Sequence, residues 1–278
     1  MNPYTLPEGN VQIAFSGGRT SGFMLHNILE ANGPLPDRVR VLFSNTGREM
    51  PQTLDFVQEV GERWGVSVVW VERDNDTGFR VVDHATAARN GEPFENLIRQ
   101  RKYLPNGVAR FCTSDLKIKP STSYRGDLGW DSWAHALGIR ADEQRRIKPA
   151  KDKRHRRWFP LADAGATRHD VEAFWKSQPF DLRLTAVRGD TLLGNCDGCF
   201  LKSERRLAML ARDYPERHAW WERMETLASE LTTNPNGATW RKQGSRAELR
   251  AFIERQGDWI FDAEDALCQR DGGECTDI

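Results

Sequence analysis

Long apolar runs are missing from this sequence: none approaches the roughly 20 residues that a membrane-spanning helix requires. Net charge is missing as well, because 40 lysines and arginines balance 40 aspartates and glutamates. The N-terminal stretch also lacks the basic region and apolar core of a secretory signal. We therefore expect a cytoplasmic protein without a membrane partner, in which only local patches of charge attract a polyanion.

Cysteine is scarce, with five residues in a chain of 278. Thiols stay reduced in the cytosol, which favours metal-binding or catalytic roles over disulfides. The chain shows no internal repeat or low-complexity segment. Its length suits one large α/β domain, or one domain with a small appendage.

The two best-known phosphate-binding motifs are also absent, namely the Walker loop and the Gly-x-Gly-x-x-Gly fingerprint. Instead, the apolar run Val11–Phe15 breaks at Ser16, Gly17 and Gly18 and leads into a helical pattern at Ser21. Glycines let the backbone approach an anion, and the first N–H groups of a helix point at it. The loop adds hydroxyl groups and one cation: Ser16, Thr20, Ser21 and Arg19. It predicts a phosphate site, with an ordinary glycine turn as the alternative interpretation.

Strand and helix patterns alternate over the first quarter of the chain. We expect strands at Val11–Phe15, Val39–Ser44 and Val66–Val71, and helices at Ser21–Ala31 and Pro51–Trp64. This order predicts an α/β fold with a Rossmann-like parallel sheet and helices on both faces. Ligands of such sheets bind beyond the carboxyl ends of the strands. The turn at 45–49 therefore joins the glycine loop as part of a candidate nucleotide site.

The remaining patterns are more mixed. Trp133–Ile139 reads as a fourth strand, and 140–157 is strongly basic, which predicts a mobile arm whose cations meet phosphates. Further helices are expected at Thr167–Lys176, at Glu204–Leu231 with a break near Pro215, and after Ser245. Cys196 and Cys199 form a Cys-x-x-Cys in a glycine-containing turn, a pattern typical of metal or redox sites.

Ser16–Ser21 resembles the PP-loop of the phosphoadenosine phosphosulfate (PAPS) reductase-like family, which belongs to the adenine nucleotide alpha hydrolase-like superfamily. Other stretches resemble that family's motifs and follow in its order: 43–49, 112–120, 138–143, 158–161 and 196–199. The resemblance implies a PP-loop nucleotide-binding domain at 1–202. It leaves 203–278 as a helical C-terminal extension with a cysteine-containing tail.

The resemblance also implies roles for individual residues. The phosphates or sulfate of ATP or PAPS would lie against Ser16, Gly17, Gly18, Arg19, Thr20 and Ser21. Asn45 and Thr46 would lie near the adenosine, and Lys117 and Arg140 would face the anhydride. Many PP-loops have Lys and Asp where this chain has Arg19 and Thr20. The missing Asp weakens the transfer of a metal-binding role, so whether Mg²⁺ binds with the nucleotide is left open.

Members of the family that hold an iron–sulfur cluster use an early cysteine pair and a late Cys-x-x-Cys. By that resemblance Cys112, Cys196 and Cys199 supply three thiolates, whereas a 4Fe–4S cluster usually takes four. Cys268 is favoured as the fourth ligand over Cys275, and zinc is the alternative metal for the same set. Glu274 and Cys275 resemble the end of the reductase tail, which implies Cys275 as a nucleophile.

Three functions follow from the resemblance. The first is transfer of sulfur from an unknown donor, with ATP activating the acceptor, which the basic segment 140–157 suggests is a nucleic acid. The second is reduction of PAPS by the tail thiolate. The third is a non-catalytic nucleotide-binding or iron–sulfur module, which turnover of ATP to AMP would distinguish from the enzymes.

Overall fold

The computed structural model describes residues 2–148, 154–187, 190–235 and 237–256. A six-stranded sheet with the order β4-β3-β2-β1-β5-β6 forms its centre. Its strands are β1 (Asn10–Ala14), β2 (Val39–Ser44), β3 (Val68–Glu72), β4 (Arg80–Val82), β5 (Trp133–Ala136) and β6 (His155–Trp158). Neighbouring strands are parallel except for β3 and β4. The predicted α/β class with a mostly parallel sheet is confirmed.

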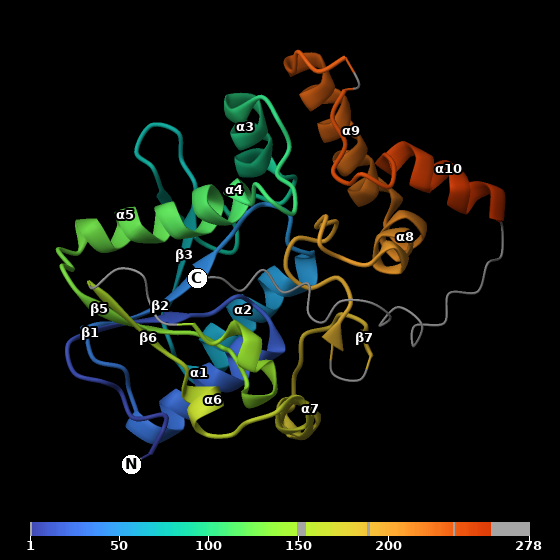
Figure 1. Ribbon diagram of the computed structural model, residues 1–278. Coiled ribbons are helices and arrows are strands. Elements are labelled where there is room, and N and C mark those ends of the chain that lie inside the picture. Colours follow the sequence, from blue (N-terminus) through green and yellow to red (C-terminus); the bar gives the residue numbers. More distant parts are fainter. Residues whose placement is uncertain (1, 149–153, 188–189, 236, 257–278) are drawn as a thin grey trace.

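Helices cover both faces of this sheet, as Figure 1 shows. One face carries α1 (Arg19–Asn32), α2 (Pro51–Trp64), α6 (Pro160–Asp163) and α7 (Arg168–Ser177), and the other carries α5 (Lys119–Asp127). Alternate residues of a strand point to opposite faces. Val11, Ile13 and Phe15 are buried together with Met24 and Leu25 of α1. Gln12 and Ala14 point the other way, toward a cavity that α5 covers.

The segment after residue 110 is helical, an element that the sequence patterns did not predict. The helix α4 (Phe111–Thr113) continues through a π-helical turn (Ser114–Ile118) into α5. Pro120 stands in the first turn of α5, where a missing N–H is tolerated. Single π-helical turns are frequent at functional sites, and this one carries Lys117.

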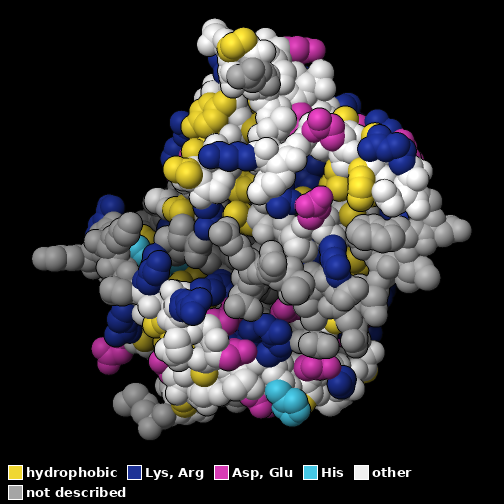
Figure 2. Space-filling model, turned by 45° about the vertical axis from the view of Figure 1, so that its right-hand side comes forward, with side chains coloured by type: hydrophobic (Ala, Val, Ile, Leu, Met, Phe, Trp, Pro, Cys, Tyr) yellow, Lys and Arg dark blue, Asp and Glu magenta, His cyan; other side chains and the backbone are white. Residues whose placement is uncertain are grey.

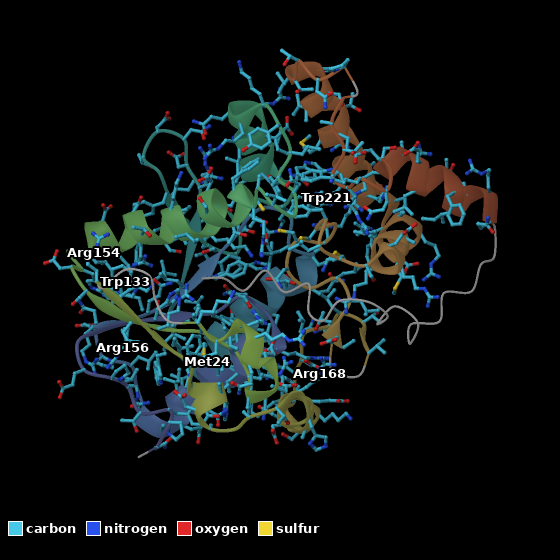
Figure 3. The ribbon with its side chains drawn as sticks, in the orientation of Figure 1. Met24, Trp133, Arg154, Arg156, Arg168 and Trp221 are labelled. Atoms are coloured by element: carbon cyan, nitrogen blue, oxygen red, sulfur yellow. The ribbon has the colours of Figure 1, made fainter. Side chains whose placement is uncertain are left out.

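The described residues of the basic segment, 140–148 and 154–157, do not form the mobile arm that its charge predicted. Ala141–Arg146 form a 3-10 turn (η2), and β6 pairs in parallel with β5, from Trp133 opposite His155 to Ala136 opposite Trp158. Residues 149–153 lie outside the described part. Charged side chains suit an edge strand, because they protect its unpaired backbone from other chains. Arg154 and Arg156 lie at this edge (Figure 3). On the face of the molecule that Figure 2 shows, basic and acidic side chains are mixed.

The C-terminal helices pack beside α3 (Glu92–Arg101) at one end of the sheet (Figure 1). They are α8 (Glu204–Asp213), α9 (Pro215–Leu231) and α10 (Arg246–Gln256), and a two-stranded hairpin precedes them, β7 (Ala186–Val187) with β8 (Asp190–Thr191). Phe94 of α3 lies 5.7 Å from the Trp220 ring and 5.8 Å from those of Trp221 and Trp240. These rings join the same core as the sheet. A domain boundary at residue 202 stays a prediction. None of the described helices combines the length and apolarity needed to cross a bilayer.

Gly17 requires glycine for two reasons, and Gly9 for only one of them. Both have positive φ, +72° for Gly17 and +79° for Gly9. An added Cβ at Gly17 would lie 2.7 Å from a Thr53 carbon, whereas an added Cβ at Gly9 would have no other atom within 4 Å. We expect Gly9→Ala to cost roughly 1–2 kcal/mol of unfolding free energy from backbone strain. Gly17→Ala should cost about 1–3 kcal/mol more, from overpacking. Urea denaturation measures both, and equal losses would contradict the packing argument.

Candidate functional site

A cavity of about 300 Å³ opens beside the loop that joins β1 to α1. Strand β1 pairs with β2 on one side and with β5 on the other. The strands before β5 are added on one side of β1, and β5 and β6 are added on the other, so the strand order reverses at β1. Such switch points are where ligands bind in α/β sheets. The cavity reaches the lower end of the range for small-molecule pockets. Its loop end is lined by Ser16, Gly18, Thr20, Ser21, Ser44, Glu49 and Lys117.

The loop itself is held by the hydroxyl group of Ser21. This hydroxyl donates to the Gly18 carbonyl oxygen at 3.0 Å and accepts from the Ser16 N–H at 3.2 Å. An added Cβ at Gly138 would lie 3.2 Å from the Ser21 Cα, so the end of β5 packs directly on the start of α1. These contacts fix the first turn of a 14-residue helix beside the cavity. Its N–H groups and dipole favour an anion there.

Arg19, expected against the phosphates, and Arg140, expected to face the anhydride, do not line this cavity. Arg19 donates to both carboxylate oxygens of Asp181, with its Nε at 2.7 Å from Oδ1. Arg140 donates to the Thr20 hydroxyl at 3.2 Å and pairs with Asp142 at 2.9 Å. Arg140 therefore supports the loop through Thr20. Direct contact of either arginine with a nucleotide stays a prediction.

Asn45 and Thr46, expected near the adenosine, are buried in the turn after β2. Asn45 donates to Glu72 at 2.6 Å and to the Ala88 carbonyl oxygen at 2.8 Å, which makes it a support for that turn. The Thr46 hydroxyl donates to Glu49 at 2.9 Å and lies 3.3 Å from the Cys196 sulfur. Glu49 lines the cavity, although sequence reasoning did not select it. The only signal for it was its place in the same turn.

The cysteines that the sequence singled out meet at a second, smaller cavity. Cys112, Cys196 and Cys199 line a space of about 20 Å³ together with Thr46 and Lys117. Cys112 is half-buried and packs against the core. Lys117 lines both cavities, so the thiols lie directly beyond the loop end of the larger one.

The electrostatics of Cys196 depend on residues of both cavities. Burial raises the pKa of its thiol well above the usual range, the Glu49 carboxylate raises it further, and the Lys117 ammonium lowers it. Lys202 is buried nearby, which lowers its pKa, and it donates to the Gly194 carbonyl oxygen at 2.8 Å. Cys196 is thus a protonated thiol at neutral pH, beside the cation that would stabilise its thiolate.

The metal site that the sequence predicted can be tested only in part. Cys268 and Cys275 lie outside the described residues. Within the described ranges, no three His, Cys, Asp or Glu side chains are grouped so as to hold a metal ion. The cavity between the three cysteines has space for about one water molecule. As arranged, these residues do not fit a four-iron cluster, so no chemical step is derived through one.

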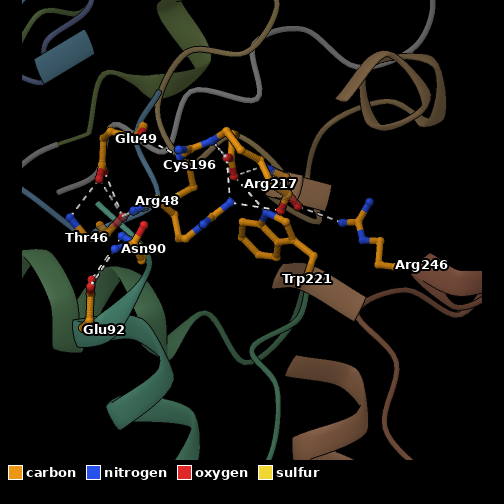
Figure 4. Close-up of polar contacts among 11 residues, drawn as sticks. Thr46, Arg48, Glu49, Asn90, Glu92, Cys196, Arg217, Trp221 and Arg246 are labelled. Atoms are coloured by element: carbon orange, nitrogen blue, oxygen red, sulfur yellow. Dashed lines mark hydrogen bonds and ion pairs between the residues drawn. The ribbon is translucent and has the colours of Figure 1, made fainter. Parts of the chain in front are cut away.

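A buried carboxylate, Asp197, fixes the Cys-x-x-Cys loop, and Figure 4 labels its partners Arg48, Arg217 and Trp221. Asp197 accepts from Arg48 at 2.8 Å, from Trp221 at 2.8 Å and from Arg217. The Arg48 guanidinium also lies over the Trp220 ring, 4.6 Å from its centroid. Asp197 therefore ties the loop that carries Cys196 to the turn after β2 and to α9.

Comparisons with known proteins place the chain in a family. Residues 10–174 match the phosphoadenosine phosphosulfate reductase domain family. The chain is 33% identical over 213 residues to the uncharacterized nin region protein ORF290 of Escherichia phage lambda, which covers 72% of this chain and 69% of that protein. A crystal structure of the phosphoadenylyl-sulfate reductase from Candida auris, a phosphate complex, is 17% identical with a TM-score of 0.45. It covers 67% of this chain and 87% of that one.

The raised pKa of Cys196 makes its reactivity depend on pH and on two neighbours. At pH 7–8 we expect slow alkylation of Cys196, and faster alkylation only as the pH approaches the raised pKa. Glu49→Gln should speed alkylation because it removes a charge that raises the pKa, and Lys117→Met should slow it. Glu95→Gln, on the surface of α3, is the control. Mass spectrometry of alkylated peptides gives each rate; neutral-pH alkylation of Cys196 as fast as in the unfolded chain would contradict the account.

Proposed function

The chain belongs to the phosphoadenosine phosphosulfate reductase domain family, and from that membership we propose an enzyme that carries out sulfur chemistry on an adenine nucleotide. The nucleotide binds in the larger cavity with its phosphates at the Ser16–Ser21 loop. A thiol of the adjoining cysteine cavity, or of the tail, attacks the sulfur of the nucleotide or delivers sulfur to an acceptor that ATP has activated. Mg²⁺ accompanies the nucleotide only if the phosphates supply most of its ligands, because the loop has no carboxylate.

The observation that carries this proposal is the position of Lys117 in the lining of both cavities. Breaking a bond between a phosphate oxygen and its substituent leaves negative charge on the phosphate. A cation held at that point stabilises the transition state more than the ground state. The same ammonium lowers the pKa of Cys196 and so favours a thiolate. One side chain thus supports both the leaving group and the sulfur nucleophile.

Two substrates fit this arrangement. With PAPS, a thiolate attacks the sulfonyl sulfur, the sulfur–oxygen bond to the phosphate breaks, and the nucleotide leaves. A second thiol then displaces sulfite and leaves a disulfide. Cys275 is proposed as the attacking thiol by resemblance. With ATP, an acceptor oxygen attacks the α-phosphate and releases pyrophosphate, after which sulfur from a donor displaces AMP.

A nucleic acid as the acceptor stays a prediction from charge alone. Part of the basic segment is already engaged: Arg146 pairs with Glu143, and Arg157 donates to the Lys148 carbonyl oxygen at 3.1 Å. Arg156 is exposed at the β6 edge and remains a candidate for phosphate contact (Figure 3).

Lys117→Met tests the proposal, with Lys119→Met as a matched control. Lys119 lies two residues further on, is exposed, and pairs with Asp115 outside the cavity. By calorimetry we expect ATP or PAPS to bind the wild type and the control alike. Lys117→Met should bind at least about tenfold more weakly, a loss of about 1.4 kcal/mol. Turnover, measured as sulfite from PAPS or AMP from ATP, should fall about 100-fold or more. Binding without turnover of either nucleotide would favour the non-catalytic module instead.

Iron–sulfur assistance, which the resemblance implied, is the second form of this chemistry, and it requires Cys112 and the Cys-x-x-Cys to move apart from the arrangement described above. Protein purified without oxygen should then contain iron and sulfide. Cys112→Ala, Cys196→Ala and Cys199→Ala should each lose the cluster absorbance, and one of Cys268→Ala and Cys275→Ala should keep it. Zinc in place of iron keeps the ligands but changes the chemistry. Full iron content in Cys196→Ala would remove the proposed ligand set.

A further inference from the structure

The larger cavity has a second end that the sulfur chemistry does not use. Beneath α5 it continues along β1 and β5 to Gln12, His135 and Arg125. Gln12 precedes Ser16 by four residues, so this end lies about 13 Å from the glycine loop by the rise of a strand. Trp133 and Arg154 also line it, and Figure 3 shows both near one end of α5.

Arg125 is the distinctive residue of this end. Only 5% of it is exposed, and its guanidinium lies over the Trp133 ring, 4.2 Å from the centroid. Its side-chain partners are neutral, the Gln12 amide oxygen and the Thr122 hydroxyl at 2.9 Å. Within the described residues no carboxylate pairs with Arg125, and its Nε has no hydrogen-bond partner. Arg48 and Arg140 are similarly buried, but each pairs with an aspartate.

The described neighbours of Arg125 at this end supply no negative charge. Burial, followed by the Arg125 charge, lowers the pKa of His135 to about 3, so this imidazole is neutral at physiological pH. Gln12 and His135 hydrogen-bond at 3.2 Å, and His155 stacks on Trp133 at 5.2 Å. Burial also lowers the pKa of Arg125, to about 10, which leaves it charged at neutral pH. This end therefore holds a buried cation for which the described residues supply no counter-ion.

We propose that this end of the cavity is a second anion subsite, in which Arg125 receives an oxyanion group of the phosphate or sulfate type. A buried charge without a partner is costly, and a bound anion removes that cost. The planar guanidinium also suits the oxygens of such a group. The anion has two sources: a second charged substituent of the nucleotide, which rests on the proposed function, or a separate small anion, which does not.

Calorimetry with three probes separates these sources. If the anion belongs to the nucleotide, adenosine 3′,5′-bisphosphate binds the wild type about tenfold more tightly than AMP, and Arg125→Met removes that difference. If it is separate, inorganic phosphate binds AMP-saturated wild type but not Arg125→Met. Phosphate binding that depends on Arg125, in a chain that binds no adenine nucleotide, keeps the subsite and removes the proposed function. Equal binding of all probes by wild type and Arg125→Met would overturn the subsite.

The melting temperature of variants tests whether Arg125 has a purely structural role. In anion-free buffer we expect Arg125→Met to melt at or above the temperature of the wild type, because an unpaired buried charge is removed. Arg48→Met, which leaves buried Asp197 without one partner, is the destabilised reference. If Arg125→Met does not fold, Arg125→Lys replaces it and should bind the bisphosphate several-fold more weakly with AMP binding unchanged. Melting of Arg125→Met as low as that of Arg48→Met, with anion binding retained in Arg125→Lys at the wild-type level, would contradict the proposal.

Discussion

The arrangement of the site depends on the hydrogen bonds and ion pairs that the buried carboxylate of Asp197 accepts. Asp197 stands between Cys196 and Cys199 in sequence, is fully buried, and accepts from side chains of the turn after β2 and of α9. Removing one partner of a buried ion pair costs about 3–5 kcal/mol, so the contact strongly resists separation of these segments. Because the turn also carries Glu49, the same contact holds the thiols at a fixed place beside the larger cavity.

Local sequence patterns predicted the first part of the fold well. β2 and α2 begin and end where periodicity and the Pro and Gly signals indicated, and α1 begins two residues earlier than expected, at Arg19. β6 was missed because its residues are mostly charged, and only pairing with β5 makes them a strand. β4 is a three-residue edge strand with exposed side chains, too short for a periodic signal.

The residues of the candidate site were likewise predicted only in part. Local motifs led to the glycine loop and the Cys-x-x-Cys, and the family resemblance added Lys117 and Cys112. These residues line two adjoining cavities. Sequence did not lead to Arg125, because a missing counter-ion becomes visible only when all the side chains around it are placed. Nor did it reveal that Asp181 and Asp142 engage Arg19 and Arg140, since an ion pair between distant segments leaves no local pattern.

A crystal structure of the chain with a bound non-hydrolysable ATP analogue or with adenosine 3′,5′-bisphosphate tests the central claim most directly. The account predicts a phosphate at the start of α1, against the Ser16–Ser21 loop and within hydrogen-bonding distance of the Lys117 ammonium. It also predicts that the sulfur atoms of Cys196 and Cys199 lie on the far side of Lys117 from that phosphate. A nucleotide bound elsewhere, with the loop and Lys117 free of phosphate contacts, would contradict the account.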